Sequence, residues 1–157
     1  MFSKESEYCH VCSVTILHRK GEPMPPVCPA CGTDLANPDS EVTHNAINCE
    51  YLKGALGLNV GEMLITSKRL LWVSRKDNET GNALVGSITG KNANKVPVSI
   101  PLEEIVRISN CKKLLRVGIT VYAKNGASYN FYLVNRGNPQ LLKDFIAPYV
   151  SNNVFES

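Results

Sequence analysis

Six cysteines give this 157-residue chain its clearest capacity for chemistry, and four of them form two pairs with the same internal spacing. Two residues separate Cys9 from Cys12, two separate Cys28 from Cys31, and fifteen residues lie between the pairs. Such spacing lets the chain fold back so that both sulfurs of a pair face one ion, and two pairs complete a tetrahedron. It therefore predicts one zinc ion bound by Cys9, Cys12, Cys28 and Cys31.

The residues around the two pairs favour a structural metal. Cys-Pro-Ala-Cys-Gly at 28–32 resembles the knuckle of zinc ribbons, and Gly32 can adopt the positive φ that turns backbone amides toward the thiolates. The first pair is followed by Ser13, where a glycine is often found. Four cysteines leave no coordination position open for water or substrate, so a catalytic zinc is not expected. A redox dithiol, unliganded thiols, or His10 or His18 as a ligand remain alternatives.

We expect no secretory signal at the start of this sequence. Its first fifteen residues include Lys4, Glu5 and Glu7 without an apolar run, and no stretch reaches the roughly 18 apolar residues of a membrane helix. We therefore expect a cytoplasmic protein, with peripheral association at the inner membrane face as an option. In that reducing compartment cysteines bind metals more often than they form disulfides.

The composition divides the chain into a small and a large part. Residues 1–40 hold three Lys or Arg against five acids, and residues 41–157 hold fourteen against nine, so the basic surplus belongs to the large part. We predict a zinc ribbon at 1–36, a linker at 37–43, a main domain at 44–152 and a tail at 153–157. Residues 77–95 are predicted to be a mobile insertion. Whether the ribbon packs on the main domain or swings on its linker stays open.

Alternating apolar residues predict a β-rich main domain. Two apolar arms meet at the polar turn 66–69, and the segment 44–53 precedes them as a strand or a helix. A glycine-rich connection at 52–61 joins the segment 44–53 to the first of these arms. Further on, alternation at 115–122 and 129–133 flanks Asn125-Gly126, which predicts a hairpin with a type I′ turn. An apolar stripe after Asn138 and Pro139 predicts a C-terminal helix that Pro148 ends or kinks.

Two stretches carry a family resemblance. Gly-Glu-Met-Leu-Ile-Thr-Ser-Lys-Arg-Leu-Leu-Trp at 61–72 resembles the signature hairpin of GRAM domains of the bacterial type, a branch of the pleckstrin-homology-like fold. Ile-Pro-Leu-Glu-Glu-Ile at 100–105 is a second match. The resemblance implies a mainly β protein, in which the N-terminal four-cysteine ribbon precedes a PH-like barrel of about seven strands capped by a C-terminal α-helix. Trp72 and the strand aromatics are expected in its core.

The resemblance also implies a binding function. GRAM and related domains commonly bind phospholipid headgroups, and a group of basic residues could supply a cationic surface for anionic lipid or for a partner: Lys68, Arg69, Arg75, Lys76, Lys112, Lys113 and Arg116. The loop at 53–61 has Lys53 as its one cation, whereas phosphoinositide-binding PH domains usually carry several there. We therefore favour an unidentified protein partner over a lipid, with nucleic-acid binding by the ribbon a distant third.

The sequence holds no recognisable catalytic constellation. Glu103 and Glu104 are adjacent and would point to opposite faces of a strand, His44 has no evident partner, and the glycine-rich loop leads into a strand. We therefore predict a non-enzymatic module without a small-molecule substrate.

Overall fold

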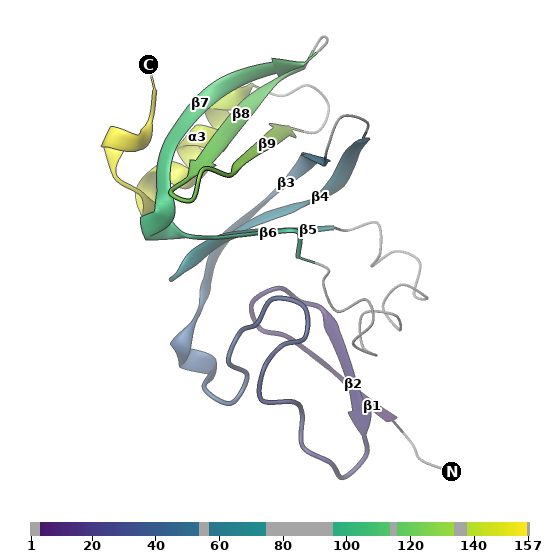
Figure 1. Ribbon diagram of the computed structural model, residues 1–157. Helices are drawn as coiled ribbons and strands as arrows, with labels where there is room; N and C mark the ends of the chain where they lie inside the picture. Colours follow the sequence, from purple (N-terminus) through teal and green to yellow (C-terminus); the bar gives the residue numbers. More distant parts are fainter. Residues whose placement is uncertain (1–3, 54–56, 75–95, 114–115, 134–137, 157) are drawn as a thin grey trace.

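The computed structural model describes residues 4–53, 57–74, 96–113, 116–133 and 138–156. The N-terminal part contains a two-stranded antiparallel sheet of β1 (Lys4–Tyr8) and β2 (Thr15–Arg19) (Figure 1). Strand β2 lies between the two cysteine pairs. Its partner β1 was not predicted, because its residues are mostly charged.

A seven-stranded sheet and one α-helix form the main domain. In sequence order these are β3 (Thr43–Lys53), β4 (Gly57–Thr66), β5 (Arg69–Ser74), β6 (Val98–Pro101), β7 (Ile105–Lys113), β8 (Arg116–Ala123), β9 (Ser128–Leu133) and α3 (Pro139–Ile146). The strands are ordered β6-β5-β4-β3-β9-β8-β7, and every adjacent pair is antiparallel. Figure 1 shows α3 behind the β7-β8-β9 half of this sheet. The predicted mainly β architecture with a C-terminal helix is confirmed.

The glycine-rich connection is shorter than predicted, because β4 already begins at Gly57. Gly61 lies inside β4, and a Cβ atom there would overlap the indole of Trp72 and the carbonyl oxygen of Val73. Trp72 is 1% exposed, and its Nε1 donates a hydrogen bond to the carbonyl oxygen of Cys49 at 3.1 Å. Gly61 is thus required for the close packing of Trp72 and does not mark a loop.

The turn between β8 and β9 differs from the predicted type I′ turn. The amide of Gly126 donates to the carbonyl of Ala123 at 3.0 Å, and the amide of Ala123 donates to the carbonyl of Ala127 at 2.8 Å. Gly126 has φ +92°, whereas Asn125 is not among the residues with positive φ. The loop therefore has three residues with the left-handed position at the glycine, a common alternative for hairpins.

The C-terminal helix covers one end of the core. Asn138 Oδ1 accepts a hydrogen bond from the amide of Gln140 at 2.9 Å, which caps α3, and the helix ends at Ile146 before Pro148. Leu142, Phe145 and Ile146 are buried, but Leu141 is 55% exposed and leaves the expected stripe. The tail then pairs with β7, since Phe155 bridges Ile108 and the amide of Glu156 donates to the carbonyl of Ile108 at 2.9 Å.

The β4-β5 hairpin is buried on both faces. Met63, Ile65, Leu70 and Trp72 belong to the core beneath α3, the barrel core. The intervening residues Leu64, Leu71 and Val73 pack with the four paired cysteines in a second cluster, the ribbon core. The ribbon therefore lies against the outer face of this hairpin.

No helix in the described ranges is long and apolar enough to cross a membrane.

Candidate metal centre at the ribbon-barrel junction

The structure brings together the four cysteines that the sequence predicts as ligands. Their sulfur atoms all lie within 4.8 Å of one another, with 3.7 Å between Cys9 and Cys31 and 3.7 Å between Cys12 and Cys28. A tetrahedral zinc with Zn–S bonds of about 2.3 Å separates its sulfurs by about 3.8 Å. The four side chains are between 1% and 7% exposed. The cluster thus has the spacing and closure of a structural metal site.

The two knuckles have matching backbone hydrogen bonds. The amide of Ser13 donates to the carbonyl of Cys9, and the amide of Gly32 donates to the carbonyl of Cys28, both at 2.9 Å. Inside each knuckle an amide also points at sulfur, with 3.4 Å from Val11 N to Cys9 Sγ and 3.4 Å from Ala30 N to Cys28 Sγ. Such N–H donors stabilise thiolates, which are the form that binds metal.

The residue after each knuckle has a left-handed conformation. Gly32 has φ +79°, as its position predicts, and Ser13 has φ +64°. A side chain makes this conformation less favourable by roughly 1–2 kcal/mol. The first knuckle therefore reaches the same geometry as the second at a cost in backbone strain.

Interactions among the thiols shift their proton affinities in opposite directions. Hydrogen bonding to Cys12, and then to Cys28, holds the pKa of the Cys31 thiol below its usual range, while contacts with Cys28 and Cys31 raise the pKa of Cys12.

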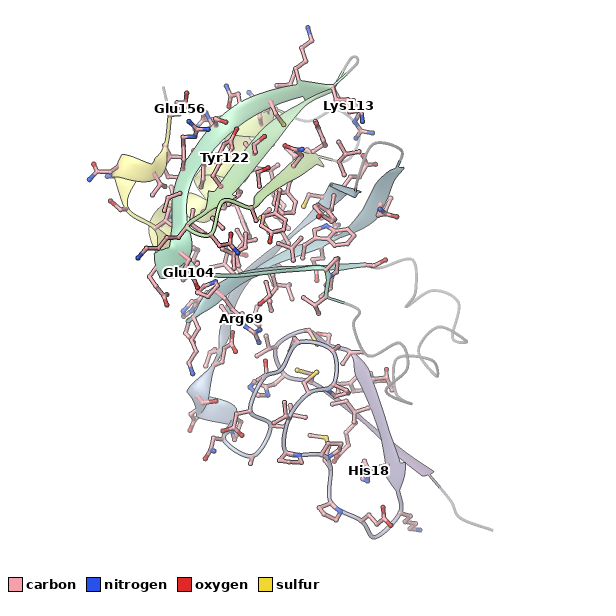
Figure 2. All side chains as sticks on the ribbon, viewed as in Figure 1. His18, Arg69, Glu104, Lys113, Tyr122 and Glu156 are labelled. Atoms are coloured by element: carbon pink, nitrogen blue, oxygen red, sulfur yellow. The ribbon has the colours of Figure 1, made fainter. Side chains whose placement is uncertain are left out.

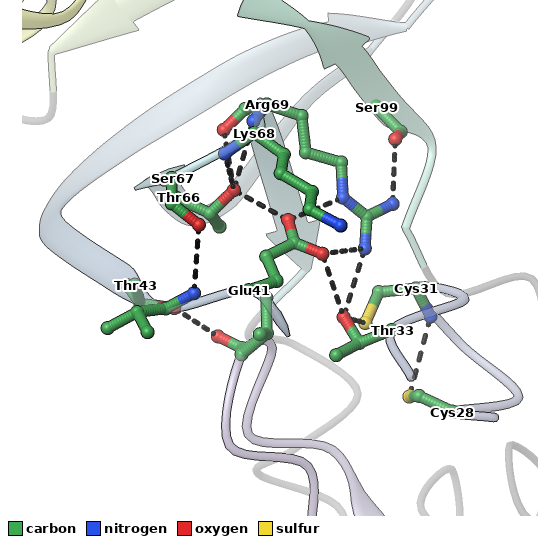
Figure 3. A network of polar contacts seen from close by, with 12 residues as sticks. Cys28, Cys31, Thr33, Glu41, Thr43, Thr66, Ser67, Lys68, Arg69 and Ser99 are labelled. Atoms are coloured by element: carbon green, nitrogen blue, oxygen red, sulfur yellow. Dashed lines mark hydrogen bonds and ion pairs between the residues drawn. The ribbon is translucent and has the colours of Figure 1, made fainter. Parts of the chain in front are cut away.

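A chain of polar contacts leads from Cys31 into the barrel (Figure 3). Thr33 Oγ1 lies 2.9 Å from Cys31 Sγ and accepts a hydrogen bond from Arg69 Nη2 at 3.0 Å. Glu41 accepts bonds from Arg69 through both oxygens, at 2.8 Å from Nε and 3.1 Å from Nη2. The hydroxyl of Thr66 also donates to Glu41 at 2.6 Å. Ribbon, linker and barrel thus share one buried network.

Glu41 is charged although it is 4% exposed. Burial alone would raise the pKa of its carboxyl group, but hydrogen bonds from Arg69 and Thr66 outweigh burial and lower it. A buried carboxylate in a bidentate ion pair with a guanidinium is stable only while both partners remain. The linker is thereby fixed to the turn between β4 and β5.

Both candidate histidines lie outside the sulfur cluster. His10 Nε2 is 3.0 Å from the carbonyl oxygen of Glu41, which adds a contact between ribbon and linker. His18 Nε2 is 3.1 Å from Glu7 Oε2, on the neighbouring strand of the ribbon sheet. Nε2 of each ring thus contacts an oxygen outside the sulfur cluster.

The predicted cationic surface is divided. Arg69 pairs with Glu41, and Arg116 pairs with Glu50 at 2.5 Å and donates to the carbonyl of Leu133 at 3.0 Å. Lys68 and Lys112 are exposed and Lys113 is partly buried. Figure 2 shows Arg69 at the ribbon junction and Lys113 at the far end of the β7-β8 hairpin. Arg75, Lys76 and the predicted insertion at 77–95 lie outside the described residues.

An open cleft of about 540 Å³ lies at the junction. The second knuckle, the linker, the β4-β5 turn and the corner after β6 all contribute to its walls, through residues that include Gly32, Asp34, Lys68, Leu102 and Glu103. Arg69 and Glu41 also line it. The cleft therefore exists only while the ribbon is packed on the barrel.

The remaining two cysteines are separate from the cluster. Cys49 is fully buried, and burial raises the pKa of its thiol to about 12. Cys111 is half-buried on β7. Cys49 therefore serves as a small apolar core residue, as expected.

Comparisons with known proteins add little to this description. No family model and no curated protein matches the chain. A solved C-terminal domain of an unknown protein from Leishmania infantum is 20% identical, with TM-score 0.47, over 71% of this chain and 89% of that one. The hSac2 domain from human phosphoinositide phosphatase Sac2 is 13% identical, with TM-score 0.43, over 74% of this chain and 77% of that one. Likeness at this level supports no functional conclusion, and the GRAM resemblance stays a prediction.

Sequence reasoning missed Thr33 and Glu41, which link the metal centre to the barrel. One signal was available in Leu70-Leu71-Trp72-Val73, an unbroken apolar run that is buried throughout. An unbroken run in a strand indicates burial on both faces. It could have predicted that another part of the chain covers β5.

Proposed function

We propose that this chain is a non-enzymatic binding module of the reducing cytoplasm, in which one structural zinc ion fixes the ribbon on a PH-like barrel. The closed shell of four buried sulfurs supports a structural role for the metal, since no coordination position remains for a substrate. When bound, zinc would supply cross-linking of the two knuckles and no reaction.

We further propose that a protein partner docks in the junction cleft. The observation that carries this proposal is that both parts of the chain build the cleft, with charged residues of both signs on its walls: Asp34, Lys68 and Glu103. Mixed charges at a rim favour selective protein recognition over attraction to any anionic surface. Two of the candidate basic residues, Arg69 and Arg116, are already in ion pairs, which weakens the case for a cationic rim.

Charge reversal at the two ends of the barrel tests this proposal. Lys68→Glu changes the cleft, and Lys112→Glu changes an exposed lysine near the tip of the β7-β8 hairpin. Affinity capture should recover a partner with wild type and with Lys112→Glu but not with Lys68→Glu. Loss with Lys112→Glu alone would contradict docking in the cleft.

Membrane binding is the alternative, favoured by the exposed Lys112 beside Lys113 at one hairpin tip. Each basic group near an anionic leaflet contributes about 1 kcal/mol. Co-sedimentation with neutral and anionic vesicles, each at low and physiological salt, distinguishes membrane binding from protein docking. Under our proposal the wild type stays in the supernatant in every condition. Binding to anionic vesicles that weakens with salt and with Lys112→Glu would establish the lipid function instead. A mobility shift at low salt tests nucleic acid in the same way.

A further inference from the structure

Thr33 occupies a special position between the sulfur cluster and the barrel. Thr33 is 1% exposed. Its hydroxyl oxygen has three polar neighbours: Cys31 Sγ at 2.9 Å, Arg69 Nη2 at 3.0 Å and Glu41 Oε1 at 3.4 Å. A hydroxyl has one hydrogen to donate and two lone pairs. Only one of its neighbours can therefore receive that hydrogen.

The chemistry of the neighbours fixes the direction of each bond. A guanidinium only donates, so the hydroxyl accepts from Arg69, and its single hydrogen goes to Cys31 or to Glu41. Glu41 already accepts two hydrogen bonds from Arg69 and one from Thr66. Its contact with Thr33, at 3.4 Å, is the longest of the three contacts of the Thr33 hydroxyl. The Thr33 hydroxyl therefore donates to Cys31 Sγ and accepts from Arg69.

The Thr33 hydroxyl joins the sulfur cluster to the barrel. It lies between Cys31 Sγ, a predicted metal ligand, and the guanidinium of Arg69. An outer hydrogen bond of this kind holds a ligand in the orientation that the metal requires.

Arg69 continues these contacts into the barrel. It stands at the start of β5, and its Nη1 donates to Ser99 Oγ on the neighbouring β6 at 3.1 Å. Its guanidinium thus contacts β6, the linker carboxylate and Thr33 (Figure 3). A change in the position of Cys31 would disturb all of these contacts together.

We infer that Thr33 and Arg69 are positioning residues of the metal site, and that through them metal binding and docking of the ribbon on the barrel strengthen each other. The inference rests on the proposed zinc site. Because such coupling is reciprocal, metal binding must strengthen docking by the same factor by which docking strengthens metal binding. A variant that weakens docking should therefore also bind the metal less tightly.

Cobalt(II) titration of the full chain tests the first half of the inference. Cobalt bound by four thiolates gives intense absorption, and competition with a chelator yields the affinity. Loss of an outer hydrogen bond typically weakens metal binding about 10- to 100-fold. We expect this for Thr33→Val and Arg69→Met, with affinities within about threefold of wild type for Thr33→Ser, which keeps the hydroxyl, and Lys68→Met, the neighbouring exposed cation.

Proteolysis after Glu41 tests the second half. A glutamyl protease should produce the fragment that begins at Val42 slowly from metal-loaded wild type, because Glu41 is buried against Arg69. Chelation should speed this cleavage at least tenfold, and Thr33→Val should speed it in the loaded protein.

Three results decide between the possibilities. Equal cobalt affinity for Thr33→Val and Thr33→Ser would overturn the coupling while leaving the zinc site intact. A rate of cleavage after Glu41 that is the same with and without chelation would overturn the coupling as well. A wild type without the thiolate-cobalt absorption would overturn the metal site, and the inference with it.

Discussion

The two faces of the β4-β5 hairpin support cores of different kinds. The barrel core contains large side chains, including Trp72, Phe131 and Leu142, and is closed by α3. The ribbon core consists largely of four cysteines and small aliphatic residues around Leu71. Apolar burial stabilises the first core in proportion to its area, whereas the second is small, and we expect it to need the proposed metal for stability. One hairpin therefore joins a self-sufficient fold to a dependent one.

Metal removal should separate the two cores most completely. Structural zinc contributes on the order of 10 kcal/mol to small domains, so strong chelation should unfold the ribbon and leave the barrel folded. Trp72 is the one tryptophan of the chain and lies in the barrel core, so its fluorescence reports the barrel alone. We expect hydrogen exchange to rise throughout 4–36 after chelation while the thermal transition seen by Trp72 changes little. Simultaneous loss of both signals would show one cooperative unit.

Glu41→Gln should have the next largest effect. Removing one charge of a buried pair typically costs about 3–5 kcal/mol, because Arg69 is left without its counter-ion. The free energy of ribbon docking, measured by denaturant-dependent hydrogen exchange in the ribbon and the linker, should fall by that order. Glu156→Gln is the matched control, since its pair with Arg107 is about half exposed on both sides. It should change stability by less than about 1 kcal/mol.

Two neighbouring leucines test the division between the faces directly. Leu70 and Leu71 are both fully buried, one in each core. Each alanine substitution should cost about 3 kcal/mol. Leu70→Ala should lower the midpoint of the Trp72 unfolding transition, and Leu71→Ala should mainly loosen the ribbon, as seen by linker cleavage. If both variants shifted both readouts equally, the cores would not be separable.

Ser13→Gly should have the smallest effect and the opposite sign. Ser13 is exposed with φ +64°, so glycine removes backbone strain without removing a buried contact. We expect the metal-loaded ribbon to gain up to about 1 kcal/mol, less the greater entropy of glycine in the unfolded chain. Competition with a chelator gives the change as tighter metal binding. Gly32→Ser is the reverse test and should weaken binding.

Local patterns predicted the parts of this molecule that local chemistry determines. The spacing of Cys9, Cys12, Cys28 and Cys31 was enough to predict their clustering, because each knuckle folds within a few residues. Alternation at 115–122 and 129–133 predicted the strands β8 and β9. Asn138 and Pro148 predicted the bounds of the helix.

The docking of the ribbon could not be predicted in the same way. It depends on Thr33, Glu41 and Arg69, which come from three separate segments and meet only after the barrel has formed. None of the three belongs to a motif for such a contact. The same limit affected the predicted cationic surface. Arg69 and Arg116 were counted as surface charges, but each forms an ion pair with a carboxylate that is distant in the sequence.

The pairing of the C-terminal tail with β7 affects how this sheet can meet other chains. An uncovered edge strand offers its free backbone groups to any extended segment, and this is a common start of aggregation. Phe155 and Glu156 occupy part of that edge at Ile108. A partner that bound by adding a strand along β7 would first have to displace them. The tail therefore competes with any such strand for the backbone groups of β7 on this side of the sheet.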